Sequence, residues 1–399
     1  MPQNTCDVLV SGGGIAGLTA AAAFGAAGFD VVCVDPAPPI TDREAKGADM
    51  RSTAMLQPAR GVLQAAGLWD KLVPHASPLQ IMRIVDAGGE TAEPRLTKDF
   101  NAADVSDLPF GWNFPNWLLR REIVTRLDEL PNVTFMPGTA TTSLFTRERE
   151  ARVGLSDGSK VRARLVIAAD GRASPMRQTA GIDVQTTRYG QKALAFAVTH
   201  PIPHENVSTE IHRTGGPFTL VPLPDRDGMP SSAIVWMDDG PLSQGRMEMD
   251  VSEFEDEISA RSCHLFGPLT LVSPRSIWPI ITQKAARLSG ERLALIAEAA
   301  HVVPPIGAQG LNMSLADTAT LLKLALERPD DLGDRRMLDA YHKARYSDIS
   351  VRIQGIDLLN RASRVNAPLL RDARATALNA LYAMGPVRKT LMQMGLGVK

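Results

Sequence analysis

The stretch "CDVLVSGGGIAGLTAAAAFGAAG", residues 6–28, predicts the fold of the N-terminal part of the chain. Its first third is apolar and β-branched, as in a buried strand. The rest is rich in alanine and indicates a helix that ends at Gly28. A second apolar run, "FDVVCVD", ends at Asp35. A strand, a helix and a strand in this order predict a βαβ unit with two parallel strands.

The glycines of this stretch have the spacing GxGxxG, at positions 12, 14 and 17. Gly12 permits a tight turn, Gly14 lets a pyrophosphate approach the backbone, and Gly17 lets the helix pack closely on the sheet. The helix N-terminus offers N–H groups and a partial positive charge to phosphates. Asp35 follows at the distance typical of an acid that binds a ribose hydroxyl. The motif predicts a bound dinucleotide, but it does not separate FAD from NAD.

The composition of the 399 residues excludes several classes of protein. The chain has 43 basic and 44 acidic residues, so its charge does not favour nucleic-acid binding. Cys6, Cys33 and Cys263 are far apart and lack metal-ligand spacing, which indicates a reducing compartment, no disulfide framework and no metal site. The sequence opens without a signal peptide and contains no long apolar run, so we expect a cytoplasmic protein without a spanning helix.

The pattern changes along the chain. Residues 181–285 are rich in short alternating runs, proline and glycine, which predicts an inserted sheet with antiparallel strands. Strand and helix patterns alternate again after Leu293, and residues from about 50 to 75 and from about 334 onward look helical. We therefore expect an α/β protein: a Rossmann-like domain, an inserted mixed or antiparallel β-sheet domain, and a C-terminal helical segment.

Two further stretches, read together with the glycine motif, identify a family. They are "LVIAADGRASPMR" (165–177) and "LALIAEAAHVVPPIGAQGLNMSLADTATL" (293–321). Over nearly the whole chain, this trio resembles the FAD-dependent aromatic hydroxylases of the para-hydroxybenzoate hydroxylase type. The segment "GPFTLVPLPD" (216–225), the second stretch and the terminal "LMQMGLG" are most similar to the ubiquinone-biosynthesis hydroxylases (UbiH/UbiF/VisC type).

The resemblance implies a discontinuous FAD-binding domain and a separate substrate domain. The FAD-binding domain would comprise residues 1–75, 101–180 and 286–340. The substrate domain would comprise residues 76–100 and 181–285, and residues 341–399 would form C-terminal helices.

The resemblance also assigns roles to single residues. Asp35 would hold the adenosine ribose, Arg51 would lie near the phosphates and ribityl chain, and Arg120 would face the cofactor. Asp170-Gly171 is linked to FAD and pyridine-nucleotide binding, and the loop from Pro305 to Asn312 would lie beneath the isoalloxazine ring. The expected cofactor-binding residues are Gly12, Gly14, Ile15, Ala16, Gly17, Asp35, Arg51, Arg120, Ala140, Asp170, Gly171, Glu298, Pro305, Gly307, Gly310, Leu311 and Asn312. No catalytic residue is identified.

One position departs from the family pattern. The chain has Ala297-Glu298 where the family usually has Gly-Asp, whose aspartate binds ribityl hydroxyls. Glu298 keeps the charge and adds a methylene, so its contact with the cofactor would differ or pass through water. His301 follows closely, and either a structural role or a position near flavin or substrate is open to it, with the structural role favoured.

The reaction implied by the resemblance is aromatic hydroxylation. NAD(P)H would reduce FAD, O2 would form a flavin C4a-hydroperoxide, and the substrate would be a polyprenyl phenol intermediate of ubiquinone biosynthesis. Two alternatives stay open. The chain could hydroxylate a water-soluble aromatic, or it could be a non-catalytic FAD-binding member of a quinone-biosynthesis assembly.

The tail of the chain is basic. Between Arg335 and Lys399, 12 Lys/Arg face 4 Asp/Glu, a net charge of +8, and apolar residues are interspersed. One interpretation is that helices pack on the FAD-binding domain and leave a solvated basic face. The other is peripheral docking at the anionic inner face of a membrane, where a polyprenyl substrate would lie.

Overall fold

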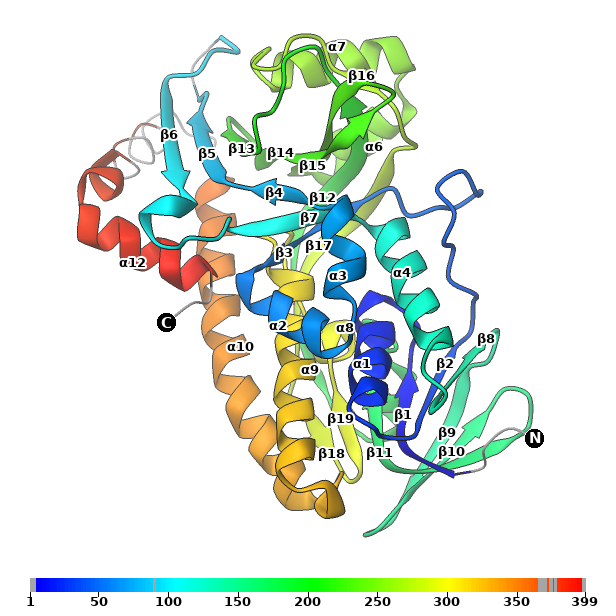
Figure 1. Ribbon diagram of the computed structural model, residues 1–399. Coiled ribbons are helices and arrows are strands. Elements are labelled where there is room, and N and C mark those ends of the chain that lie inside the picture. The colour runs from blue at the N-terminus through cyan, green and yellow to red at the C-terminus, as the bar shows by residue number, and fades with distance from the viewer. Residues whose placement is uncertain (1–4, 89–90, 365–371, 373–375, 377–378, 397–399) are drawn as a thin grey trace.

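The first sheet carries the predicted βαβ unit. The computed structural model describes residues 5–88, 91–364, 372, 376 and 379–396. The strand order of this sheet is β18-β19-β11-β1-β2-β8, and β10 joins β11 to β9. Figure 1 shows it in the lower half of the molecule. Its strands are β1 (Thr5–Ser11), β2 (Val31–Asp35), β8 (Val133–Pro137), β9 (Thr141–Thr146), β10 (Ala151–Leu155), β11 (Lys160–Ala168), β18 (Ser289–Gly290) and β19 (Leu293–Leu295).

Strand β1 lies at the centre of this sheet and pairs in parallel with β2 and β11. Val8, Leu9 and Val10 are fully buried, as expected for a parallel strand covered on both faces. Helix α1 (Ile15–Ala26) packs against α4 (Asn116–Asp128) and α9 (Gln309–Glu327). The C-terminal ends of β1 and β2 therefore meet the N-terminus of α1 at one edge of the sheet, where α/β proteins bind ligands.

The second sheet is mixed, because β13 and β5 pair in parallel while its other pairs are antiparallel. Its strand order is β20-β17-β12-β15-β14-β13-β5-β6, with β16 on β12. One face is covered by α6 (Gly240–Glu248) and α7 (Val251–Arg261), at the top of Figure 1. Its strands are β5 (Ile81–Asp86), β6 (Leu96–Asn101), β12 (Val184–Thr199), β13 (Val207–His212), β14 (Pro217–Arg226), β15 (Met229–Asp239), β16 (Thr270–Leu271), β17 (Ser276–Ala285) and β20 (His301–Val302).

A small third sheet lies between the other two and joins them (Figure 1). Its order is β3-β7-β4, and β7 and β4 both contact β14 of the second sheet. Strand β3 and the helix α2 that follows it both contact α9. The elements of this region are β3 (Ser52–Leu56), α2 (Gln57–Ala65), α3 (Trp69–Leu72), η1 (Val73–His75), β4 (Ser77–Leu79), η2 (Ala102–Asp104) and β7 (Gly111–Pro115).

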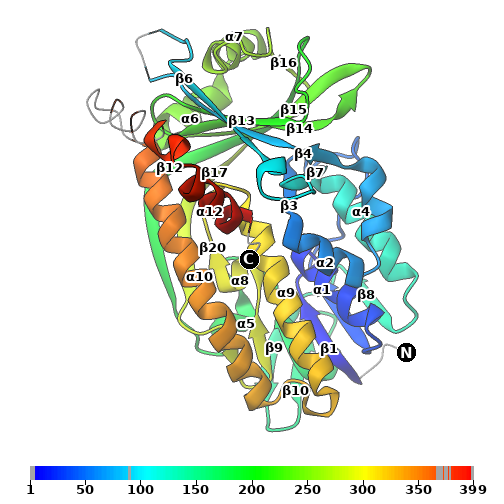
Figure 2. The same cartoon turned by 60° about the vertical axis from the view of Figure 1, so that its left-hand side comes forward.

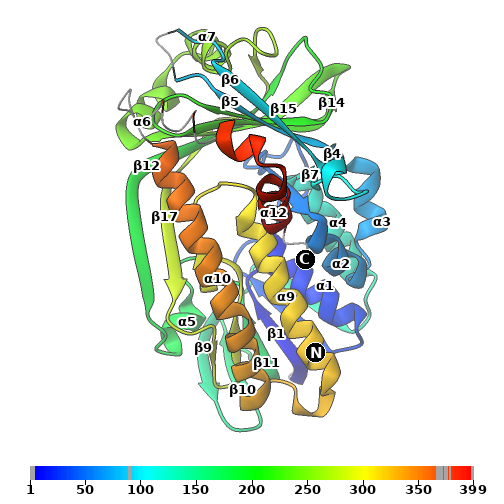
Figure 3. The ribbon, with the colours of Figure 1, turned by 90° about the vertical axis from the view of Figure 1, so that its left-hand side faces the viewer.

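The C-terminal part is helical. Helix α10 (Arg335–Ser363) runs antiparallel to α9, as Figures 2 and 3 show. Helix α12 (Gly385–Leu396) lies near β6 and η2, and Met392 packs with Ala54, Leu79 and Phe110. The remaining short elements are α5 (Pro175–Thr179), α8 (Ala297–Ala300) and η3 (Pro329–Asp331). Within the described residues, no helix combines the length and apolar character that crossing a bilayer requires.

The predicted α/β class with an inserted mixed sheet is confirmed, but the helical reading of residues 50–75 is wrong at its start. Residues Ser52–Leu56 form a strand because they pair with β7, a partner that is distant in the sequence. The predicted domain limits stay a prediction. In the tail, Leu378 and residues 365–371, 373–375 and 397–399 lie outside the described residues.

Candidate cofactor and substrate site

The N-terminus of α1 has the geometry of a phosphate site. Gly12 has a φ of +110°, and a Cβ there would lie 2.4 Å from the Ala169 carbonyl oxygen. A Cβ on Gly17 would lie 1.9 Å from the Gly12 carbonyl oxygen, so helix and turn touch. Gly14 is exposed, and a Cβ there would meet nothing within 4 Å. No side chain of the described residues caps α1, so no side chain competes with a pyrophosphate for the first N–H groups of the helix.

Asp35 stands at the end of β2, beside this turn. Its carboxylate accepts hydrogen bonds from the Gly13 N–H at 2.5 Å and the Ala37 N–H at 2.9 Å. The side chain is partly exposed. A ribose hydroxyl could share this carboxylate, because a carboxylate accepts up to about four hydrogen bonds.

Arg51 and Arg120 meet at one carboxylate that the sequence analysis missed. Asp49 accepts a bidentate pair from Arg51, at 2.7 Å and 2.7 Å. It also accepts from the Asn116 amide and from Arg120, both at 3.1 Å. The Arg51 guanidinium lies 5.4 Å from the centre of the Trp278 ring. Asp49 therefore orients both predicted cofactor-facing arginines.

Asp49 predicts an acid-sensitive contribution to stability. Burial raises the pKa of its carboxyl, but the hydrogen bonds and charges of Arg51 and Arg120 and the Asn116 amide outweigh burial and lower the pKa from 3.8 to about 2. A carboxyl whose pKa is lower in the folded state than in the unfolded state stabilises the fold at pH values above the unfolded pKa. This stabilisation is lost as the pH falls through the folded pKa. Relative to Asp49→Asn, the wild type should lose about 2 kcal/mol between about pH 4 and about pH 2 in denaturant titrations. Parallel losses in both proteins would contradict this assignment.

The structure shows local roles for Asp170, Gly171 and Ala140, in hydrogen bonds or in the backbone conformation. Asp170 accepts from the Ser174 hydroxyl at 2.5 Å and the Met176 N–H at 3.0 Å, which fixes the start of α5. Burial raises the pKa of the Asp170 carboxyl. The Ala140 N–H donates to Ser156 Oγ at 3.0 Å. Gly171 has a φ of +83°, a conformation that favours glycine. Contacts of these residues with a cofactor stay a proposal.

The predicted flavin loop opens into a cavity of about 390 Å³. Pro305, Gly307, Gly310 and Leu311 line one side of it, with Arg51, Arg172 and Glu298. Much of the remaining lining comes from the second and third sheets and the residue before β7. It includes Leu79, Ile81, Met82, Phe110, Asn113, Ser208, Glu210, Thr219, Val221, Val235, Trp278 and Ile280. The cavity thus joins residues of the predicted cofactor and substrate domains.

Strand β14 presents only one of its faces to this cavity. Thr219 and Val221 line it, whereas Phe218 and Leu220 are buried on the other face, beneath α7. The alternation follows from the strand period of two. Asn113 also lines the cavity, and its amide donates to Ser52 Oγ at 3.0 Å and to the Pro222 carbonyl at 2.8 Å.

Asn312 connects the flavin loop to the third sheet. Its Oδ1 accepts from the Leu56 N–H at 2.8 Å, and its Nδ2 donates to the Ala54 and Ala308 carbonyls at 2.7 Å each. The side chain is therefore occupied by the protein backbone and positions the start of α9. Ala308 has a φ of +55° there, and α9 has no side-chain cap among the described residues. A helix N-terminus in this place would stabilise negative charge on a bound flavin.

The Glu298 side chain is 51% exposed. It forms an ion pair with Arg172 at 3.3 Å, and both residues line the cavity. Ala297 has a φ of +54°, a conformation that favours glycine, the residue that the resemblance leads one to expect there. The backbone turn is kept with alanine at the cost of strain of about 1 kcal/mol.

His301 is part of a buried network rather than of the cavity wall. Its Nε2 lies 2.7 Å from Asp317 Oδ2, and Arg345 Nε donates to Asp317 Oδ1 at 2.8 Å. Burial raises the pKa of the Asp317 carboxyl, but His301 and Arg345 outweigh burial and lower it. The Ala297 N–H also points to Asp317, at 3.3 Å. The structural role favoured for His301 agrees with this geometry.

The network continues back to the flavin loop. Arg345 donates to Asp348 at 2.6 Å, and Asp348 accepts from Arg352 at 3.1 Å. Arg352 donates to Gln309 Oε1 at 2.8 Å, and Gln309 Nε2 donates to the Gly307 carbonyl at 2.9 Å. A chain of hydrogen bonds through α9 and α10 therefore links the Ala297 turn with the Gly307 loop.

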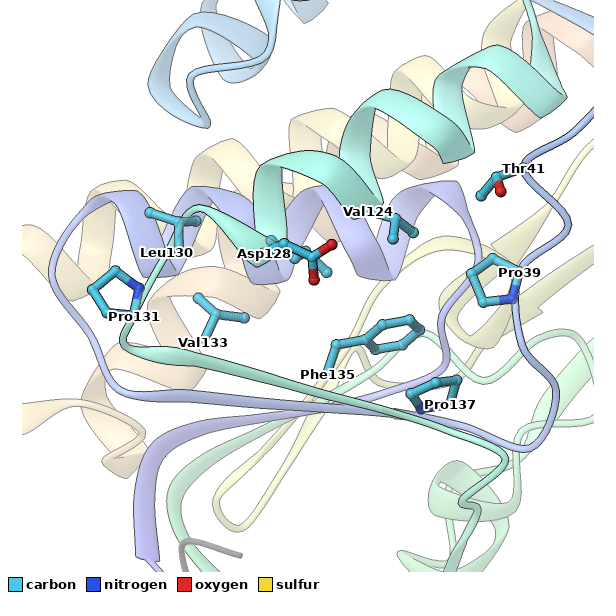
Figure 4. Close-up of a pocket in the computed structure, with 10 residues that line it drawn as sticks. Pro39, Thr41, Val124, Asp128, Leu130, Pro131, Val133, Phe135 and Pro137 are labelled. Carbon is cyan, nitrogen blue, oxygen red and sulfur yellow. The ribbon is translucent and has the colours of Figure 1, made fainter.

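A second hollow lies at the edge of the first sheet. Figure 4 shows it between the loop with Pro39 and Thr41, helix α4 and strand β8. Its volume is about 540 Å³, larger than that of the cavity at the flavin loop. Asp128 is its one ionisable lining residue in the described part of the chain, and none of the predicted cofactor-binding residues lines it. The chemistry therefore belongs to the smaller cavity.

Taken together, the two ends fit FAD. The exposed Gly14 and the uncapped α1 suit the pyrophosphate, and Asp35 suits the ribose. The exposed Gly307 and Gly310 let a flat ring approach the backbone beside the cavity. When bound, FAD would supply reducing equivalents and oxygen activation, while this chain would hold the cofactor and enclose the substrate.

Comparisons with known proteins agree with this geometry. The FAD binding domain family matches residues 5–350. The ubiquinone hydroxylase UbiL of Rhodospirillum rubrum is 33% identical over 398 residues, covering 99% of this chain and 90% of the relative. The 3-demethoxyubiquinol 3-hydroxylase of Escherichia coli K12 is 25% identical over the full length of both chains. The crystal structure of p-nitrophenol 4-monooxygenase PnpA from Pseudomonas putida superposes with a TM-score of 0.80 at 19% identity, with both chains fully covered.

The fold, the paired ends of the cofactor site and these matches lead to one assignment. The chain belongs to the FAD binding domain family and is an FAD-dependent aromatic monooxygenase.

Proposed function

We propose that the chain hydroxylates the ring of a polyprenylated phenol in ubiquinone biosynthesis, with NAD(P)H as reductant and O2 as oxidant. The observation that carries the proposal is the cavity between the flavin loop and the second sheet. The relatives of the chain include the ubiquinone hydroxylase UbiL and 3-demethoxyubiquinol 3-hydroxylase, and these matches support a substrate of the same class.

The size and lining of the cavity support an aromatic ring with an apolar substituent. Its volume of about 390 Å³ is at the lower end of small-molecule sites, which range over about 300–1,000 Å³. Leu79, Phe110 and Val221 give the sheet side an apolar surface. The isoalloxazine ring would take up part of this volume, so a polyprenyl tail would have to leave the cavity. Met392 of α12 packs on Leu79 and Phe110, so apolar surface continues toward the C-terminal helices.

The protein's own contribution is to position the ring and exclude water. Apolar side chains around the ring exclude water and strengthen the few polar contacts within. Arg51 and Arg172 supply positive charge on the cofactor side, while Asn113, Ser208, Glu210 and Thr219 supply polar groups on the sheet side. This separation suits a site in which the cofactor and the substrate contact opposite sides of the cavity.

A substrate comparison tests the proposal. Purified, FAD-loaded protein is given NADH or NADPH, O2 and either a prenylated phenol or the same phenol without its tail, and hydroxylated product is measured. We expect kcat/KM to be at least about 10-fold higher for the prenylated phenol, because one isoprene unit buries several methylene groups. A preference for the tailless phenol would favour a water-soluble substrate. Absence of product from every phenol, with FAD bound, would favour the non-catalytic alternative.

We also propose that the C-terminal helices touch an anionic membrane surface, where a polyprenyl substrate would lie. On α10, Val351, Leu358 and Leu359 have exposed fractions of 64%, 69% and 57%. Leu381 and Met384, further along the tail, are also exposed. Apolar side chains in a segment of net charge +8 are the combination that binds bilayer surfaces. A contact with other quinone-biosynthesis proteins would use the same surface.

Replacing Leu358 and Leu359 by serine tests the membrane contact. Both side chains are exposed, so the fold should tolerate the change. In sedimentation with vesicles of anionic and zwitterionic lipid, the double variant should bind at least about 5-fold more weakly than the wild type. A matched control replaces the exposed Leu242 of α6, on the far side of the second sheet, and should bind as the wild type does. Equal sedimentation of all three proteins would refute the contact.

A further inference from the structure

The substrate side of the cavity contains one carboxylate. Among the described residues that line the cavity, the acids are Glu298 and Glu210. Glu298 lies on the cofactor side and pairs with Arg172. Glu210 lies on β13, whose alternation buries Thr209 and Ile211 on one face and turns Glu210 to the other, toward the cavity. A carboxylate in a mainly apolar cavity lowers the stability of the protein unless it is paired or hydrogen-bonded. Such a group is therefore a candidate for a functional role.

The partner of Glu210 is His212, two residues further along the same face of β13. His212 Nε2 lies 2.7 Å from Glu210 Oε1. The other ring nitrogen, Nδ1, is buried and has no hydrogen-bond partner among the described residues. A histidine with a purely structural role would be expected to use both nitrogens when buried. The pair therefore has the arrangement of a carboxylate and a histidine that holds it in place.

The surroundings of the pair leave the free side of Glu210 to the cavity. Thr219 of β14 lies opposite Glu210 in the sheet, and Ile84 of β5 lies on the other side. Asp86 of β5 lies beside His212 and is paired with Arg95 at 2.7 Å. These residues flank the pair in the sheet, and none of the hydrogen bonds of the described residues links Arg95 to the Glu210 carboxylate.

We propose that Glu210 is the catalytic base that takes the proton of the substrate's phenolic hydroxyl, and that His212 is its positioning residue. The inference rests on the proposed function. The overall reaction is phenol + O2 + NAD(P)H + H⁺ → diphenol + H2O + NAD(P)⁺: the O–O bond breaks, one oxygen atom forms a C–O bond with the ring, and the other leaves as water. As the oxygen adds, positive charge develops on the ring and its hydroxyl, and the O–H group becomes far more acidic than a free phenol. The O–H bond breaks, its electron pair stays with the substrate oxygen, and the proton forms an O–H bond with Glu210. General bases of this kind contribute about 10²–10⁴-fold to rate.

Asn113 also lines the cavity, and its amide oxygen is buried. Its side chain is buried, its amide nitrogen is held by Ser52 and Pro222, and its Oδ1 has no partner in the described part of the chain. The orientation of the amide is therefore fixed, with Oδ1 left to accept a hydrogen bond.

The test compares Glu210→Gln, Glu210→Asp and the matched control Glu253→Gln, an exposed residue of α7. We expect Glu210→Gln to keep its bound FAD and its unfolding midpoint, to lower kcat for hydroxylation at least about 100-fold, and to divert NAD(P)H consumption to hydrogen peroxide. Glu210→Asp should recover part of the rate because it keeps the carboxylate. The control should match the wild type.

The pH profile distinguishes a base from a structural side chain. The part of the wild-type pH profile of kcat that reports the general base should be absent from the residual activity of Glu210→Gln. An unchanged kcat and profile in Glu210→Gln would overturn the inference while the wild type still hydroxylates a phenol. Failure of the wild type to hydroxylate any phenol would instead overturn the proposed function.

Discussion

Replacing Asp317 by asparagine is expected to lower the free energy of unfolding by about 3 kcal/mol, because it removes the charge that pairs with Arg345 inside the protein. The Asp317 side chain is fully buried, and it also bonds His301 and the Ala297 N–H. Breaking a buried pair costs about 3–5 kcal/mol. The lower end applies here because Arg345 keeps a second partner, Asp348, at 2.6 Å. Urea unfolding at neutral pH measures the change.

The same variant should weaken FAD binding, because the network joins the Ala297 turn to the Gly307 loop. A matched control is Asp339→Asn, which removes the surface pair with Arg287 and should cost less than about 1 kcal/mol. If Asp317→Asn costs no more than this control, the buried network does not hold the two turns together.

Replacing Gly14 by alanine is expected to lower FAD affinity about 100-fold while leaving the apoprotein as stable as the wild type. A Cβ at Gly14 would meet nothing within 4 Å of protein, and the φ of −69° is one that alanine adopts readily. The methyl group would stand where the pyrophosphate approaches the helix N-terminus. Flavin fluorescence titration gives the affinity, and thermal unfolding of the apoprotein gives the stability.

Alanine variants of two further glycines serve as comparisons for this result. Gly17→Ala would place a methyl group 1.9 Å from the Gly12 carbonyl oxygen, so it should destabilise the apoprotein as well as weaken FAD binding. Gly61→Ala lies in the exposed middle of α2 with open space around it, so it should leave FAD binding unchanged. Normal FAD affinity in Gly14→Ala would mean that the phosphates bind elsewhere.

Much of the fold could be predicted because its signals are local. The glycine motif, the alanine-rich α1 and the apolar β1 each follow from neighbouring residues. Strand β3 was missed because its pairing with β7 joins residues about 60 positions apart, and no periodicity within Ser52–Leu56 reports it. The face of β14 that meets the cavity could not be chosen either, because both of its faces are mostly apolar.

The sequence indicated which segments would form the candidate site. It did not indicate which contacts the side chains of these segments make. Asn312 was expected near the ring, yet its side chain binds the backbone of β3. Asp170 accepts hydrogen bonds from Ser174, the N-cap of α5, and from the Met176 N–H; Ser174-Pro175 could have signalled this helix start. Asp49 and Glu210 carry no motif, because their importance comes from residues that folding brings to them.

The order of strands in the first sheet has a consequence for synthesis of the chain. Strand β11 lies between β1 and β19, and the flavin loop follows β19. Because Gly17 and Gly307 are far apart in the sequence, they leave the ribosome roughly 15–60 s apart at a synthesis rate of about 5–20 residues per second. A nascent chain would present the phosphate turn long before it could hold the isoalloxazine ring. Cofactor capture should thus be a late event, completed only once α9 has emerged, and ribosome-bound fragments that end before residue 309 should not retain flavin.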